Sequence, residues 1–384
     1  MIKMVIDNIE DKVKEHFENL YPLCQKRIDF LLRVIDYFNN KDFTQIEIFD
    51  VNKKKDLANS ILSNKIVKKK GQVLNNNDFS TNSIDVKFDQ INLINILKTL
   101  RKKNILKKII KYKYFDLIKR EKKILSKLNV NKQNEQYINN IFEIIFDYDD
   151  FSKKKESTYD SYVLSKNLNV DVCPYCNRSY TNTIMKGSQK KDRIIRPEFD
   201  HFYSKSKYPL FSLSFYNLIP SCHFCNSSLK GDKEFSNLTH TNPYFLGFES
   251  DSVFIIKNLT TIKNSIQANE IKLHLDIKNQ KSKIHKETVI EGNKKVFKLE
   301  EIYQEGYINI ANEILSKIKH QIYDINKICN LFNNKINTKK EIYEFYFSNY
   351  YDIKDFQKRP LAKFTKDIFD DIDKIYQSDF KKFL

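Results

Sequence analysis

Residues 196–233 read RPEFDHFYSKSKYPLFSLSFYNLIPSCHFCNSSLKGDK, an aromatic and aliphatic background with few polar interruptions. The interruptions that stand out are the Asp200-His201 pair, Asn217, the Cys222-His-Phe-Cys225 turn and Asn226 directly after it. An imidazole titrates near neutral pH, and carboxylate and amide oxygens are ligands that hard divalent cations prefer. The stretch therefore predicts a small site built around a cysteine knuckle.

A second CxxC turn, Cys173-Pro-Tyr-Cys176, lies upstream of this stretch. A CxxC turn places two sulfurs on one side of a knuckle, and two knuckles complete a tetrahedral thiolate site for zinc. The gap between the knuckles is wider than in a simple zinc ribbon, so we expect folded structure between them. Cys24 and Cys329 have no partner pattern and are expected to be small buried residues.

Taken together, residues 173–233 resemble the HNH endonucleases, also called ββα-metal or His-Me finger nucleases. The family's pattern is Asp-His, then Asn-Leu, then a CxxC knuckle followed by Asn or His and a nearby lysine, and this chain has each element in order. The segment is most similar to zinc-knuckle members such as endonuclease VII-type junction resolvases and HNH proteins of Septu-type or retron-associated anti-phage defence. Ser204 stands where many relatives have proline, which changes loop stiffness rather than chemistry.

The resemblance implies a role for each polar residue. His201 is expected to be the general base that activates water, leaving 5′-phosphate and 3′-hydroxyl ends. The remaining assignments are Asp200 and Asn226 as ligands of a catalytic Mg²⁺ or Mn²⁺, Asn217 as the residue that fixes the loop and orients His201, Lys230 as a phosphate contact, and Cys173, Cys176, Cys222 and Cys225 as ligands of a structural zinc. Glu198 can join the acidic cluster.

Composition sets broader limits on the chain. It has 384 residues, of which 41% are hydrophobic and 30% charged, as in a soluble globular protein. Only 6 Gly and 7 Pro favour helices over a turn-rich all-β fold. The formal charge of +18 favours a polyanionic partner such as DNA, although a lysine-rich surface also serves solubility alone.

The N-terminal residues predict neither a signal peptide nor a membrane anchor. They are amphipathic and carry acidic residues from Asp7 onward, and no uncharged run approaches the roughly 18 apolar residues of a membrane span. We therefore expect a cytoplasmic protein without a membrane partner. In that compartment paired cysteines are metal ligands more often than disulfides.

Hydrophobic periodicity predicts a helical region over 1–150, short strands and connections over 251–296 and a second helical region over 297–384. The resemblance implies that the HNH module lies between them, over 151–250. Val13, Phe17, Leu20 and Tyr21 keep helical spacing near the start, and the polar stretch 64–84 predicts a loop. SVFIIKNL and the alternating pattern through Val289 indicate strands.

The segment from Leu93 to Leu128 is helical in pattern and densely basic. Isoleucines and leucines recur between the lysines, so one face packs on a core and the other is charged. The charged face is either merely solvated or a contact for the phosphate backbone of DNA, and the pattern alone does not separate the two.

These features predict an α+β protein that is mostly helical, with a central ββα-metal HNH nuclease module stapled by a zinc-binding site of four cysteines. The expected function is a metal-dependent DNA endonuclease, the nuclease effector of an anti-phage defence system. One alternative is a non-catalytic zinc-knuckle module that binds nucleic acid. A third is an interaction subunit whose nuclease stays silent until a partner such as an ATPase engages the helical arms.

Overall fold

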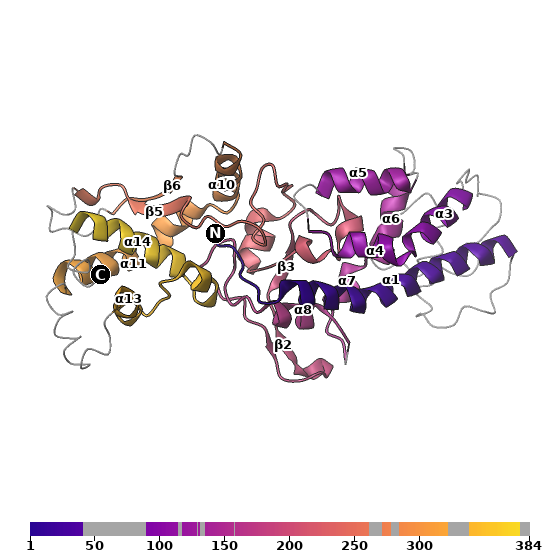
Figure 1. The fold of residues 1–384 in the computed structure, drawn as a ribbon, viewed down its shortest axis with the longest axis horizontal. Helices are drawn as coiled ribbons and strands as arrows, with labels where there is room; N and C mark the ends of the chain where they lie inside the picture. The colour runs from indigo at the N-terminus through magenta and orange to yellow at the C-terminus, as the bar shows by residue number, and fades with distance from the viewer. Residues whose placement is uncertain are drawn as a thin grey trace.

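The computed structural model describes residues 1–40, 90–113, 117–128, 130, 135–156, 158–260, 271–277, 284–321 and 338–376. The molecule is elongated, with helices from the N-terminal region at one end, the strand β3 near the middle and the C-terminal elements at the other end (Figure 1). The expected loop over 64–84 lies outside the described residues. The expected α+β class is confirmed in its coarse form, as a helix-rich chain with small antiparallel sheets.

Helices dominate the N-terminal region, as the periodicity predicts. They are α1 (Ile9–Asn40), α3 (Gln90–Leu100), α4 (Lys103–Ile110), α5 (Leu117–Lys127), α6 (Glu135–Ile145), α7 (Tyr148–Ser152) and α8 (Ser161–Leu168). Val13, Phe17 and Leu20 are each 1% exposed and form the buried stripe of α1. The basic pattern from Leu93 to Leu128 corresponds to three helices rather than one.

Short elements surround the knuckles in the middle of the chain. They are β1 (Ile184–Met185), the 3₁₀ turn η2 (Lys190–Asp192), β2 (Arg193–Ile195), β3 (Glu198–His201), the 3₁₀ turns η3 (Pro209–Phe211) and η4 (Phe215–Asn217), β4 (Leu218–Ser221) and the π-helical turn η5 (Phe224–Lys230). Strands β3 and β4 are antiparallel, with Glu198 opposite Ser221 and His201 opposite Leu218. Folded structure therefore fills the gap between the knuckles, as expected.

The C-terminal end combines one two-stranded sheet with helices. Its elements are β5 (Ser252–Ile256), β6 (Leu273–Ile277), α10 (Ile284–Val296), α11 (Leu299–Gln321), α13 (Lys339–Phe347), the 3₁₀ helix η7 (Ile353–Lys358) and α14 (Ala362–Tyr376). The expectation of strands through Val289 is wrong over α10, where Val289 and Ile290, with Phe297 directly after the helix, are buried at helical rather than alternating spacing.

The first residues of the chain join the middle of the molecule to its C-terminal end. Ile2 N donates to Pro174 O at 2.8 Å, beside the first knuckle, and Val5 N donates to Gln357 Oε1 at 2.8 Å. Met1, Ile2 and Met4 are buried there. None of the described helices combines the length and apolar character needed to cross a membrane.

Candidate metal centre and active site

The four paired cysteines come together in one buried cluster. The Sγ atoms of Cys173, Cys176, Cys222 and Cys225 all lie within 4.8 Å of one another, and the Sγ atoms of Cys176 and Cys222 are 3.9 Å apart. Four convergent thiols are the donor set of a tetrahedral metal site, so the cluster can hold a metal ion. Cys24 is buried elsewhere in the core, as expected, and Cys329 lies outside the described residues.

The first knuckle is held by short local bonds. Cys173 N donates to Ser179 O at 2.9 Å, and Asn177 N donates to Cys173 O at 2.8 Å. Asn177 has a φ of 52°, in the left-handed region that asparagine tolerates well. The second knuckle begins directly after β4, where Asn226 N donates to Cys222 O at 3.0 Å. Tyr175 of the first knuckle donates to Asp200 on β3, so both knuckles lie beside the β3–β4 pair.

Asp200 is a buried partner in an ion pair. Its Oδ1 accepts from Lys230 Nζ at 2.6 Å and its Oδ2 accepts from Tyr175 Oη at 2.6 Å, while Lys230 Nζ also donates to His201 O at 2.7 Å. The Asp200 and Lys230 side chains are each 3% exposed. The Lys230 ammonium is turned inward in this structure and neutralises Asp200, so the phosphate contact expected of Lys230 stays a prediction.

His201 follows Asp200 on β3 and has a different set of neighbours, as alternation along a strand requires. Its Nε2 lies 2.9 Å from Ser212 O, and its ring meets the Tyr148 ring edge-on with centroids 4.4 Å apart. A carbonyl oxygen only accepts, so Nε2 carries the proton and Nδ1 has the free lone pair. Burial is the main cause that lowers the pKa of His201 to about 3, so the ring is neutral at pH 7.

A second buried histidine supports the same loop from a distant part of the chain. His16 in α1 places its Nε2 2.8 Å from Leu213 O and its Nδ1 3.0 Å from Tyr159 Oη. Burial lowers the pKa of His16 to about 4. Two neutral imidazoles thus donate to two successive carbonyls, those of Ser212 and Leu213. No local motif marks His16, so a reading of the sequence had no signal for this role.

Asn217 closes the loop between β3 and β4. Its Oδ1 accepts from Tyr203 N at 2.8 Å, and its Nδ2 donates to Tyr203 O and Phe211 O, both at 3.1 Å. The side chain is 1% exposed. Asn217 is therefore bonded within the loop that carries Ser212, whose carbonyl is the hydrogen-bond partner of His201.

Asn226 faces Glu198 rather than Asp200. Its Nδ2 donates to Glu198 Oε2 at 2.8 Å, and the Glu198 carboxylate also pairs with His223 Nδ1 at 2.7 Å and accepts from Ser227 Oγ at 2.9 Å. The expected cation would need oxygens from Asp200 and Asn226. In this structure Asp200 is instead paired with Lys230 and Tyr175, so the two expected ligands have different partners.

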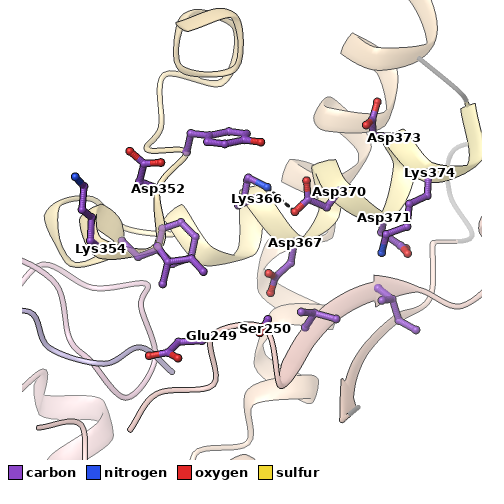
Figure 2. Close-up of a pocket in the computed structure, with 15 residues that line it drawn as sticks. Glu249, Ser250, Asp352, Lys354, Lys366, Asp367, Asp370, Asp371, Asp373 and Lys374 are labelled. Carbon is purple, nitrogen blue, oxygen red and sulfur yellow. Dashed lines mark hydrogen bonds and ion pairs between the residues drawn. The ribbon is translucent and has the colours of Figure 1, made fainter. Parts of the chain in front are cut away.

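A cavity of about 810 Å³ lies at the C-terminal end and is lined by none of the expected site residues. Figure 2 shows carboxylates from Asp367, Asp370 and Asp371 on α14 and from Asp352 and Glu249 around it. Lys354, Lys366 and Lys374 offset part of this charge. An acid-rich lining repels a phosphate backbone, so the cavity does not suit the polyanion that the net charge favours.

No protein-family model, no curated protein and no solved structure matches the chain.

Proposed function

We propose that the chain is an HNH-type endonuclease that hydrolyses DNA phosphodiester bonds, with His201 as its general base and a zinc ion in the four-cysteine cluster. One observation carries the proposal. On a strand that packs beside the cysteine cluster, a neutral imidazole is held by a backbone carbonyl so that its second nitrogen keeps a lone pair. No partner for this Nδ1 exists among the described residues.

The proposed reaction uses this lone pair. Nδ1 takes a proton from a water molecule, the water oxygen attacks phosphorus, and the bond from phosphorus to the 3′ oxygen breaks as that oxygen takes a proton from solvent. A pKa of about 3 makes the free ring a weak base. An approaching phosphodiester carries a negative charge, which favours the imidazolium and raises this pKa when substrate is bound.

Zinc in the cysteine cluster would have a structural role. Cys222 follows the strand that pairs with β3, and Cys225 lies in η5, which carries Lys230 to Asp200. A metal ion held by both knuckles would therefore fix the strand and the turn around His201. Thiolate binding energy adds directly to folding energy in sites of this kind.

A requirement for Mg²⁺ or Mn²⁺ is a separate part of the proposal. No step is assigned to such a cation, because Lys230 already neutralises Asp200. If a cation is needed, either the Lys230 ammonium moves away from Asp200 or the cation binds elsewhere. Assays with each ion and with EDTA distinguish a cation-dependent enzyme from a cation-independent one.

The test is cleavage of plasmid DNA by the purified chain beside His201→Ala and a matched histidine control. His274→Ala is the control, because His274 lies on β6 at the C-terminal end and pairs there with Glu300. We expect cutting by the unmodified chain and by His274→Ala, and none by His201→Ala. Zinc content and circular dichroism establish that each variant is folded.

Other outcomes point to the alternatives. DNA binding without any cleavage, in a folded zinc-loaded chain, favours a non-catalytic binding module. Cleavage that appears only when a partner such as an ATPase is added favours a nuclease that is silent alone. Undiminished cleavage by His201→Ala contradicts the assignment of the base.

A further inference from the structure

Helices α4 and α5 present lysines from two different elements to one shallow hollow. Lys108 in α4 and Lys123 and Lys127 in α5 line it, with Ile124 and Leu128 among the apolar side chains beneath. Beside this hollow, α4 buries Leu106, Ile109 and Ile110. The burial of these apolar faces fixes both helices, so the lysines are held as a group.

These three charges differ from those on the neighbouring side of the helices. Toward α1, two basic residues are neutralised, because Lys113 pairs with Glu10 at 2.5 Å and Arg101 pairs with Asp29 at 2.6 Å. Within the described part of the chain, Lys108, Lys123 and Lys127 form no ion pair. Each is exposed. Among the residues that the structure describes, the three lysines of the hollow therefore keep their positive charge without a neighbouring carboxylate to neutralise it.

We propose that Lys108, Lys123 and Lys127 form a binding surface for the phosphate backbone of double-stranded DNA. Duplex DNA carries about one charge per 1.7 Å of its axis, and lysines bind it by releasing counterions. Contacts of this kind position DNA without reading its sequence. The role of the surface in holding substrate for cleavage rests on the proposed nuclease function, whereas the binding itself does not.

The surface is fastened to the loop that supports His201. Ser214 Oγ donates to Ile109 O of α4 at 2.5 Å, and the Tyr112 ring lies 6.2 Å from the Phe211 ring of η3. Ser212, in the same loop, accepts from His201. The lysine hollow and the proposed base therefore share one support, and DNA bound at the hollow would keep a fixed relation to His201.

The test measures binding of a short fluorescent duplex by anisotropy at several salt concentrations. All variants carry His201→Ala, so that the duplex is not cut. The test variant is Lys108→Gln/Lys123→Gln/Lys127→Gln. The control is Lys257→Gln/Lys272→Gln/Lys354→Gln, which removes the same charge from three exposed lysines at the C-terminal end. Circular dichroism and zinc content confirm that both variants are folded.

We expect the test variant to lose roughly tenfold or more in affinity and its slope of log K against log salt to fall by about 3, near 0.9 per lost contact. The control should keep the parental slope. Equal weakening by both variants, or no duplex binding by the parent, would overturn the proposal. If binding depends on the hollow but no form of the chain ever cleaves DNA, the binding surface stands and the nuclease proposal fails.

Discussion

At the scale of single residues, the site depends on buried groups that are neutral or neutralised. His16 and His201 each keep an uncharged ring in the core and donate to adjacent carbonyls of one loop. Lys230 neutralises Asp200 in a pair that is 3% exposed on both sides. Substituting one residue of such a pair leaves a buried polar group without its partner. The resulting loss of stability can be measured for each residue.

Because His16 and His201 are buried as neutral rings, we expect the protein to lose stability in mild acid. Each has a folded pKa, about 4 for His16 and about 3 for His201, below the ordinary value of 6.5. Between these values the unfolded chain binds more protons, so the free energy of unfolding falls as pH drops from 6.5 toward 4. Each ring contributes up to about 1.4 kcal/mol per pH unit in this window.

Urea denaturation at several pH values, with His16→Gln beside the parent, measures this contribution. Glutamine can still donate to Leu213 O but does not titrate. Glu121 acts in the opposite direction, because burial raises its pKa to about 7, and comparison with the parent removes that effect. A His16→Gln variant as acid-sensitive as the parent would count against a neutral His16.

Lys230→Met should be among the most destabilising single changes. It leaves Asp200 buried with only the Tyr175 hydroxyl as a partner, and breaking a buried pair costs about 3–5 kcal/mol. The double variant Asp200→Asn/Lys230→Met removes the isolated charge and should recover part of the loss. Chemical denaturation of the two single variants and the double variant gives the coupling energy. Additive losses would contradict a direct ion pair.

At the scale of elements, periodicity and spacing predicted the features that short windows of sequence encode. The stripe of α1 and the strand β5 follow from short windows of sequence, and the two CxxC turns predicted the cysteine cluster. Helix α10 was misassigned because its adjacent Val289 and Ile290 suit a strand as well as a helix over a few residues. The inward turn of Lys230 depends on tertiary contacts that no local pattern encodes.

Contacts between residues far apart in the sequence explain the other features of the site that the sequence did not predict. His16 meets Leu213 at a separation of 197 positions, and only the packing of α1 beside the loop makes it a supporting residue. Asn226 lies in the expected turn, but its side chain donates to Glu198, while Asp200 is buried with Lys230. The sequence predicted which residue types lie in the candidate site, but it did not predict their hydrogen-bond partners.

Two glycines in neighbouring helices differ in the space around them, so a substitution at one serves as the control for the same substitution at the other. A Cβ at Gly292 in α10 would lie 2.0 Å from Thr239 O, whereas one at Gly306 in α11 would have nothing within 4 Å. Gly292→Ala should therefore cost about 1–3 kcal/mol through the backbone clash. Gly306→Ala should add about 0.5–1 kcal/mol by favouring the helix. Thermal denaturation of both variants suffices, and equal effects would contradict the packing of α10 on the 239–242 segment.

At the scale of the whole molecule, the first knuckle joins the site to the C-terminal elements. Asn177 Nδ2 donates to Phe356 O at 2.9 Å, Lys363 N donates to Asn177 Oδ1 at 2.9 Å, and Leu361 N donates to Asn177 O at 2.6 Å. Tyr303 Oη also donates to Cys176 O at 2.7 Å. The geometry of the knuckle therefore sets the position of η7, α11 and α14.

Loss of the metal ion should consequently loosen the C-terminal end as well as the cysteine cluster. Cys222→Ser removes one thiolate, and we expect lower zinc content, a lower melting temperature and faster amide exchange at Leu361 and Lys363. Hydrogen exchange followed by mass spectrometry measures the amides, and metal analysis measures the zinc. Exchange that rises only around the cysteines would show that the C-terminal end is held independently of the knuckle.

Asn177→Gly tests whether the metal site depends on the hydrogen bonds that join the first knuckle to the C-terminal elements. Glycine adopts the φ of 52° without strain, so the knuckle should keep its shape and its zinc. The variant lacks the side-chain bonds to Phe356 and Lys363 but keeps the backbone bond from Leu361. We therefore expect faster exchange at Lys363 with unchanged metal content. If Asn177→Gly lost zinc as Cys222→Ser does, the metal site would depend on the Asn177 side chain and on its bonds to the C-terminal end.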